Sequence, residues 1–92
     1  MPRKKAKTKQ WWTTAYFNRE GDVYEGAHSF VQSYKSEEVL LEDLKHGMKN
    51  FYGPRGVFAV MAWSGQLSRH DALRTTPPRF TVLSDGELLS NR

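Results

Sequence analysis

The sequence predicts an α+β fold, in which a four-stranded antiparallel sheet packs against one amphipathic helix in the order ββαββ. Three observations support this prediction. Two β-rich segments come first, residues 36–52 then carry apolar residues at helical spacing, and two further apolar segments follow. With 92 residues, of which 38% are hydrophobic and 13% aromatic, we expect one small core in which aromatic rings fill much of the volume.

The first two strands are predicted to form a hairpin. Residues 11–18 are rich in Trp, Thr, Tyr and Phe, which favour strands, and residues 18–22 form a polar cluster with a glycine that suits a turn. The alternation in residues 23–31 leaves two registers open. Either its valines face the core and Tyr24 and Phe30 face solvent, or the two rings are buried. We favour the second register because a small core needs aromatic rings.

The helix is predicted over residues 36–52. Ser36 suits the N-cap position, and the two glutamates after it lie where the helix dipole favours carboxylates. Apolar residues then recur at intervals of three and four, which is typical of one buried helix face. Gly53 and Pro54 are expected to end the helix, with the glycine in a left-handed cap.

Three segments are expected to complete the domain after the helix. They are a strand that is either buried on both faces or centrally placed, one or two helical turns behind a capping box, and a fourth strand, after which a tight turn could return a short last strand to the sheet. These segments lie at residues 57–63, at residues 68–71 and onward, and at residues 79–83 with 84–89.

The excess positive charge of the chain lies in residues 1–10. This segment has five basic residues and no acid, whereas residues 11–92 hold nine Lys and Arg against ten Asp and Glu. The basic residues of the segment are Arg3, Lys4, Lys5, Lys7 and Lys9. The sequence therefore predicts a disordered basic arm, residues 1–10, attached to a single α+β domain, residues 11–92.

The arm is a candidate nucleic-acid-binding element. Basic side chains that neutralise phosphates release condensed counterions, which favours binding at low salt. Trp11 and Trp12 follow the arm directly, and exposed indoles can stack on unpaired bases. The alternative is a solubilising terminus. In that case one indole lies in the core and the other on the open face, because neighbours in a strand point to opposite faces.

A second set of residues is expected to bind a partner. Tyr24 and His28 would lie on the outward face of the hairpin in the first register, where aromatic side chains suit base stacking or a protein interface. The others are basic residues of predicted loops, where functional residues concentrate. They are Arg55, Arg69, Arg74 and Arg79, with His70 among them. Alternatively, these arginines belong to solvated loops and pair with Asp71 and nearby acids.

No residue pattern indicates a catalytic centre or a cofactor. The chain has no cysteine, its three histidines lack metal-ligand spacing, and no standard glycine-rich phosphate loop occurs. No segment approaches the roughly 18 to 20 apolar residues that span a bilayer. We therefore expect a non-enzymatic cytoplasmic protein with no catalytic residues, no cofactor, no metal, no small-molecule substrate and no membrane contact.

The length, the single helix among four strands and the basic arm resemble the small proteins with which phages disable host defence, in particular anti-CRISPR proteins. The resemblance implies a stoichiometric inhibitor that docks on a ribonucleoprotein surveillance complex of crRNA and Cas subunits and blocks target DNA binding. The arm would contact the guide RNA, and the aromatic residues and the loop over residues 69–79 would contact protein. Two alternatives stay open, an autonomous RNA- or DNA-binding module and an assembly factor whose basic end is incidental.

Overall fold

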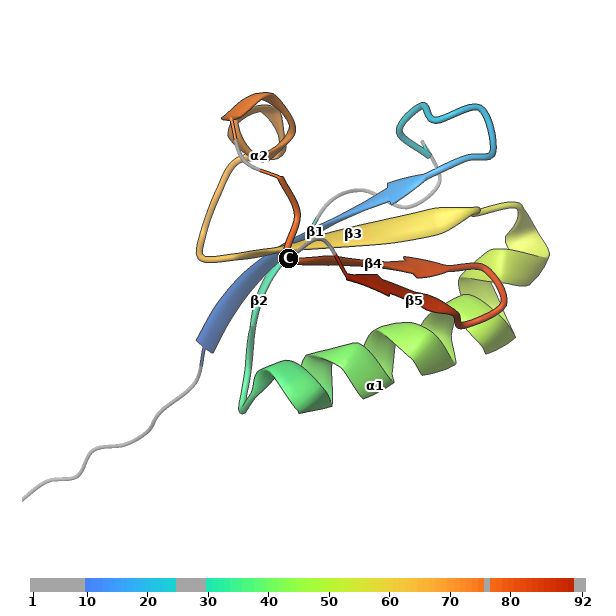
Figure 1. Ribbon diagram of the computed structural model, residues 1–92, viewed down its shortest axis with the longest axis horizontal. Coiled ribbons are helices and arrows are strands. Elements are labelled where there is room, and N and C mark those ends of the chain that lie inside the picture. The colour runs from blue at the N-terminus through green and yellow to red at the C-terminus, as the bar shows by residue number, and fades with distance from the viewer. Residues whose placement is uncertain (1–9, 25–29, 76, 91–92) are drawn as a thin grey trace, which may run out of the picture.

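The computed structural model describes residues 10–24, 30–75 and 77–90. In these residues a five-stranded antiparallel sheet carries α1 along one face and α2 on the other (Figure 1). The strands and α-helices are β1 (Gln10–Phe17), β2 (Phe30–Tyr34), α1 (Glu37–Gly47), β3 (Ala59–Ser64), α2 (Arg69–Thr75), β4 (Phe80–Leu83) and β5 (Leu88–Ser90). The α+β class with one main helix is confirmed, but the sheet has five strands rather than the predicted four.

The strands are ordered β2-β1-β3-β4-β5, and each neighbouring pair is antiparallel. The fifth strand exists because the turn expected at residues 84–87 forms. The amide of Leu83 donates to the carbonyl of Glu87 at 2.8 Å, and Gly86 takes the positive φ of 88° that the turn requires. This turn folds β5 back onto β4, so the last segment forms a three-residue edge strand.

The turn after β1 also lies where the sequence predicts it. The amide of Asn18 donates to the carbonyl of Asp22 at 2.8 Å, and the Asn18 side chain accepts from the Asp22 amide at 3.0 Å. Gly21 has a φ of +94°, which a residue with a side chain rarely adopts. The local sequence of residues 18–22 therefore sets the reversal of the chain.

The strand predicted over residues 23–31 is wrong in its bounds. Val23 forms one isolated bridge with Phe17, but β2 begins only at Phe30, which pairs with Thr14. The Phe17–Val23 bridge and the Thr14–Phe30 pair are three positions apart on β1 but seven positions apart on the opposing segment. Of the predicted strand, Phe30 and Val31 belong to β2, which continues to Tyr34, and residues 25–29 lie outside the described residues.

The start of α1 follows its local signals. The Oγ of Ser36 accepts a hydrogen bond from the amide of Val39 at 3.2 Å, and Glu37 and Glu38 occupy the first turn. This arrangement satisfies one of the amides that the first helical turn leaves without a partner. The predicted N-terminus of the helix is therefore confirmed.

The end of the helix differs from the prediction. After α1 the chain continues through a π-helical segment, Met48–Tyr52, and a 3₁₀ turn, Gly53–Arg55. Gly53 keeps a right-handed φ of −57°, and the left-handed residue is Gly56, with a φ of 105°. The wider π-helical turn carries helical backbone past Gly53, so the exit shifts by three residues.

The sheet has a larger core on its α1 face and a smaller one on the opposite face. The larger core consists of Trp12, Tyr16, Leu40, Leu44, Met48, Val57, Val60, Ala62, Phe80 and Val82. The smaller core consists of Ala15, Phe17, Trp63 and Ala72. Since β3 contributes to both, the prediction of a strand buried on two faces is confirmed. We call the face opposite α1 the open face.

Candidate functional site

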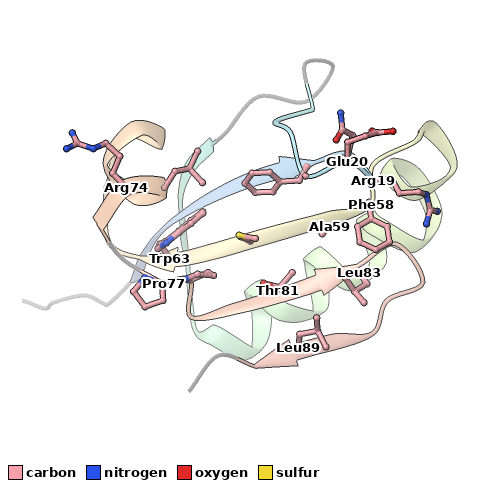
Figure 2. A pocket seen from close by; sticks show the side chains of 16 residues that line it. Arg19, Glu20, Phe58, Ala59, Trp63, Arg74, Pro77, Thr81, Leu83 and Leu89 are labelled. Atoms are coloured by element: carbon pink, nitrogen blue, oxygen red, sulfur yellow. The ribbon is translucent and has the colours of Figure 1, made fainter.

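The open face contains a groove of about 790 Å³. It lies between α2 on one side and the β1 turn on the other (Figure 2). Its volume falls within the range of about 300 to 1,000 Å³ that is common for binding pockets. We call this hollow the open-face groove.

The floor of the open-face groove is apolar because four neighbouring strands, β1, β3, β4 and β5, point alternate side chains to this face. The register places Phe17 beside Ala59 and Ala59 beside Leu83 in one row. The next row runs from Met61 to Thr81 and Leu89. Trp63, Leu73, Pro77 and Pro78 complete the apolar lining toward α2. This surface is suited to apolar side chains of a ligand or partner.

The walls of the groove carry positive charge. Arg19 from the β1 turn and Arg74 from α2 line it at opposite ends, and Glu20 is the one acidic residue of the described lining. The guanidinium of Arg19 lies 4.9 Å from the centroid of the Phe58 ring, a cation–π contact that holds both side chains at the groove. The groove therefore combines an apolar floor with a cationic rim.

The position of α2 depends on a buried hydroxyl of β1. The Thr13 Oγ1 donates to the carbonyl of Gly65 at 2.8 Å and accepts from the amide of Leu67 at 2.9 Å. Thr13 is only 1% exposed, and both bonds are partly buried. They fix the connection between β3 and α2, and Ala72 then packs α2 onto the open face. The wall of the groove is thus anchored to its floor.

The predicted basic loop cluster is divided by the structure. Arg69 and Arg74 belong to α2, where the Arg74 side chain lies 3.3 Å from the Nε2 of His70. Arg79 precedes β4 instead, and its guanidinium pairs with Glu37 of α1 at 3.2 Å. Arg74 lines the open-face groove, and the side chain of Arg69 lies outside what the structure describes.

Two other predicted residues, Tyr24 and Arg55, are brought together. The Tyr24 hydroxyl donates to the carbonyl of Arg55 at 3.1 Å, and the Arg55 guanidinium lies 4.2 Å from the centroid of the Phe51 ring. Tyr24 is partly buried against the core on the α1 face, whereas Val31 is 44% exposed. For these two residues the favoured register, with the tyrosine inward, holds.

The two tryptophans lie as the alternation predicts. Trp12 is 3% exposed in the larger core, and Trp11 is 46% exposed on the open face. Trp11 is therefore available for stacking, and Trp12 is a core residue. The remaining candidates lie outside the described residues; they are Arg3, Lys4, Lys5, Lys7, Lys9 and His28.

Sequence reasoning missed most of the groove. Leu73 and Leu89, each 43% exposed, lie at its two sides, and Arg19 and Phe58 form one end. The alternation of large side chains in residues 59–63 could have indicated which residues share the open face. Their neighbours from β4, β5 and α2 follow only from the strand order.

Within the described ranges, no group of three or more His, Cys, Asp or Glu side chains is placed to hold a metal ion. In those same ranges no helix has the length and apolar character needed to cross a bilayer. Comparison with protein-family models, with curated proteins and with solved structures found no match to this chain. Its function is therefore inferred from the surfaces described above.

Proposed function

We propose that this chain is a non-enzymatic inhibitor of the anti-CRISPR kind, which docks on a nucleoprotein complex and blocks target DNA binding. In this proposal the open-face groove binds a protein subunit, and the basic arm contacts the guide RNA. The observation that carries it is the groove itself, with an apolar floor between Arg19 and Arg74.

The composition of the groove favours a protein partner over a nucleic acid. Protein interfaces combine an apolar centre with a polar rim, and arginine and aromatic side chains are enriched in them. Trp63 is 2% exposed and Phe17 8% exposed, so their rings offer little free surface to stack on bases. Leu73 and Leu89, in contrast, present exposed aliphatic surface. An apolar segment of a subunit with acidic neighbours matches both the floor and the rim.

The arm supplies a contact of a different kind. Its five cations precede Trp11, the exposed indole of β1 on the same open face as the groove. Attraction between these cations and RNA phosphates would be strongest at low salt. A single partner that offers both protein and RNA is then bound at two points, which increases the overall affinity through the effective concentration.

The test is an interference assay in bacterial strains that each carry one defined CRISPR–Cas system. Expression of the chain is expected to restore plasmid transformation in at least one strain. The purified chain should then co-migrate with that strain's surveillance complex at a fixed ratio and prevent it from binding target DNA. If transformation is restored in none of the strains, the inhibitor proposal is contradicted.

Matched variants test the role of the groove. Leu73→Asp and Leu89→Asp place a charge on its apolar sides, and each is expected to weaken co-migration by about tenfold or more. Val39→Asp is the control, because Val39 is 46% exposed but lies on α1. Equal losses in all three variants would show that the groove is not the docking surface.

One observation favours the alternative of an autonomous nucleic-acid-binding module. The exposed Trp11 and the basic arm would together bind single strands by stacking and charge. This module should bind free oligonucleotides with an affinity that falls steeply with salt, and Trp11→Ala should weaken the binding. The inhibitor proposal instead expects binding to the complex that exceeds binding to either free RNA or free DNA.

A further inference from the structure

A second hollow, of about 370 Å³, lies between α1 and the β2 edge of the sheet, on the face opposite the open-face groove. Four of its nine lining residues are aromatic, and they come from β1, β2 and the π-helical segment. The lining consists of Tyr16, Gln32, Tyr34, Asp43, Leu44, His46, Gly47, Phe51 and Tyr52. We call this hollow the tyrosine pocket.

The aromatic rings of the tyrosine pocket form one connected cluster. The centroids of Tyr16 and Tyr52 are 4.5 Å apart at 40°, and those of Phe51 and Tyr52 are 4.8 Å apart at 83°. Aromatic faces carry negative partial charge and attract cations that come within about 6 Å. The same cluster already shows this property, because the Arg55 guanidinium lies 4.2 Å from the Phe51 centroid outside the pocket lining.

The formal charge of the pocket is negative. Its lining includes the carboxylate of Asp43 and neither Lys nor Arg. The Tyr34 hydroxyl lies 2.9 Å from the Gln32 Oε1 and 3.4 Å from the Asp43 Oδ2, so it can donate its proton to either acceptor. Among the residues that the structure describes, no ion pair involves Asp43. The Asp43 carboxylate is thus not neutralised there.

The hydroxyl groups add no negative charge of their own. Burial, followed by the proximity of Tyr52, raises the pKa of Tyr16 well above its ordinary value. Burial and Asp43 raise the pKa of Tyr34 to about 12. Both phenols therefore stay neutral at physiological pH and leave Asp43 as the one anionic group among the lining side chains.

We propose that the tyrosine pocket binds an organic ammonium group, with Asp43 as the counter-ion and the tyrosine rings as the surrounding π surface. Aromatic rings around one carboxylate suit a large, weakly hydrated cation. A bare calcium ion, in contrast, takes about six to eight oxygen ligands with several carboxylates. This proposal is independent of the inhibitor function, since it uses residues of the α1 face and none of the groove.

The test uses choline and its neutral isostere, the alcohol in which carbon replaces the quaternary nitrogen. In NMR titrations at low salt, choline is expected to shift the ring resonances of Tyr16, Tyr34 and Tyr52 saturably. The isostere, of equal size but without charge, should bind at least about tenfold more weakly. Equal binding of the two compounds, or no shift with choline, would overturn the proposal.

Two helix variants test the counter-ion. Asp43→Asn is expected to weaken choline binding by about tenfold, while Glu42→Gln, which removes a charge at the adjacent exposed position, should change it less than about twofold. Both positions are exposed, and backbone NMR spectra show whether each variant is folded. Unchanged choline affinity in Asp43→Asn would overturn the proposal.

The source of the ammonium group is settled by a further comparison. A blocked lysine amide and its trimethylated form present the group as a protein side chain does, whereas choline presents it as a free small molecule. Tighter binding of either lysine amide would assign the pocket to a partner's lysine, and tighter binding of choline would assign it to a free amine. Absence of binding by all three probes would contradict the inference.

Discussion

The guanidinium of Arg79 lies 3.2 Å from the carboxylate of Glu37, so the residue that precedes β4 is tied to the first turn of α1. The pair lies at the α1 side of the sheet, while the groove and Arg74 lie on the open face. The two side chains are 48% and 37% exposed. Solvent screens a pair of this kind, so its contribution to the free energy of unfolding is small.

The first prediction concerns this ion pair. Arg79→Gln should lower the free energy of unfolding by no more than about 1 kcal/mol, and the loss should shrink as salt is added. Urea denaturation at low and high salt measures both quantities. Because the Arg79 guanidinium pairs with Glu37 of α1 and does not line the groove, this variant should keep its affinity for the complex, whereas Arg74→Gln should weaken it. The reverse order of affinities would place the docking surface on the α1 side.

The second prediction concerns the hydroxyl of Thr13. Thr13→Val keeps the shape of the side chain but removes the bonds to Gly65 and Leu67, and it leaves the partly buried Leu67 amide without its partner. We expect a loss of about 1 to 3 kcal/mol in the free energy of unfolding, measured by urea denaturation. Amide hydrogen exchange should increase selectively in the connection between β3 and α2.

Thr81→Val is the control for Thr13→Val. It makes the same hydroxyl-to-methyl change on the open face of β4, where Thr81 is 7% exposed. Exchange in the connection between β3 and α2 should stay at the wild-type rate. An equal effect of both variants on that connection would show that the Thr13 hydrogen bonds do not anchor α2.

The elements that sequence reasoning located correctly are those with strong local signals. Ser36 caps α1, and the Oγ of Ser68 likewise accepts from the Asp71 amide at 3.0 Å at the start of α2. Each bond joins residues three positions apart, so a short stretch of sequence contains all the information. The turns at residues 18–22 and 84–87 are local in the same way.

The features that sequence reasoning missed depend on contacts across the chain. Val23 and Phe30 both lie in β-favouring sequence, and pairing with β1 decides that only the second begins a strand. The groove joins Phe17, Leu73 and Leu89 because the order β1-β3-β4-β5 sets their elements side by side. Strand order is not encoded in any local pattern, so no candidate list drawn from the sequence could contain this set.

The third prediction concerns two glycines at the end of the helix. A Cβ at Gly53 would collide with the carbonyl oxygen of Met48 and approach that of Ser84 at 2.9 Å. Both are backbone atoms that cannot turn aside, so Gly53→Ala should be destabilising, by about 1 to 3 kcal/mol on the scale of an overpacked site. Thermal or urea denaturation measures the loss.

Gly47→Ala is the matched control for Gly53→Ala, with the opposite expected effect on stability. A Cβ at Gly47 meets only the Tyr52 ring, at 3.6 Å, which is an ordinary van der Waals distance. Gly47 has a helical φ of −63°, so alanine is expected to stabilise the protein by up to about 1 kcal/mol. If both variants were equally destabilised, the helix end would be strained at Gly47 as well.

The fourth prediction concerns alkaline stability and Tyr34. Burial, with Asp43 as the second cause, raises the pKa of this phenol from 10 to about 12. Between these values the unfolded chain releases the proton while the folded protein keeps it, so the unfolding free energy falls as pH rises. The contribution of the Tyr34 hydroxyl to the unfolding free energy is complete below pH 10 and is lost as pH passes through about 12.

Tyr34→Phe removes this ionisable hydroxyl and with it part of the pH dependence of the unfolding free energy. Urea denaturation at pH 9 and pH 11 should therefore show a smaller drop in unfolding free energy for the variant than for the wild type, with about 1.4 kcal/mol per pH unit as the upper limit for one group. The absorbance of tyrosinate in the folded variant should show that one tyrosine fewer than in the wild type loses its proton at high pH. A variant whose stability falls as steeply as that of the wild type would mean that the Tyr34 hydroxyl is solvated, and that the other phenols of the tyrosine pocket govern the alkaline response.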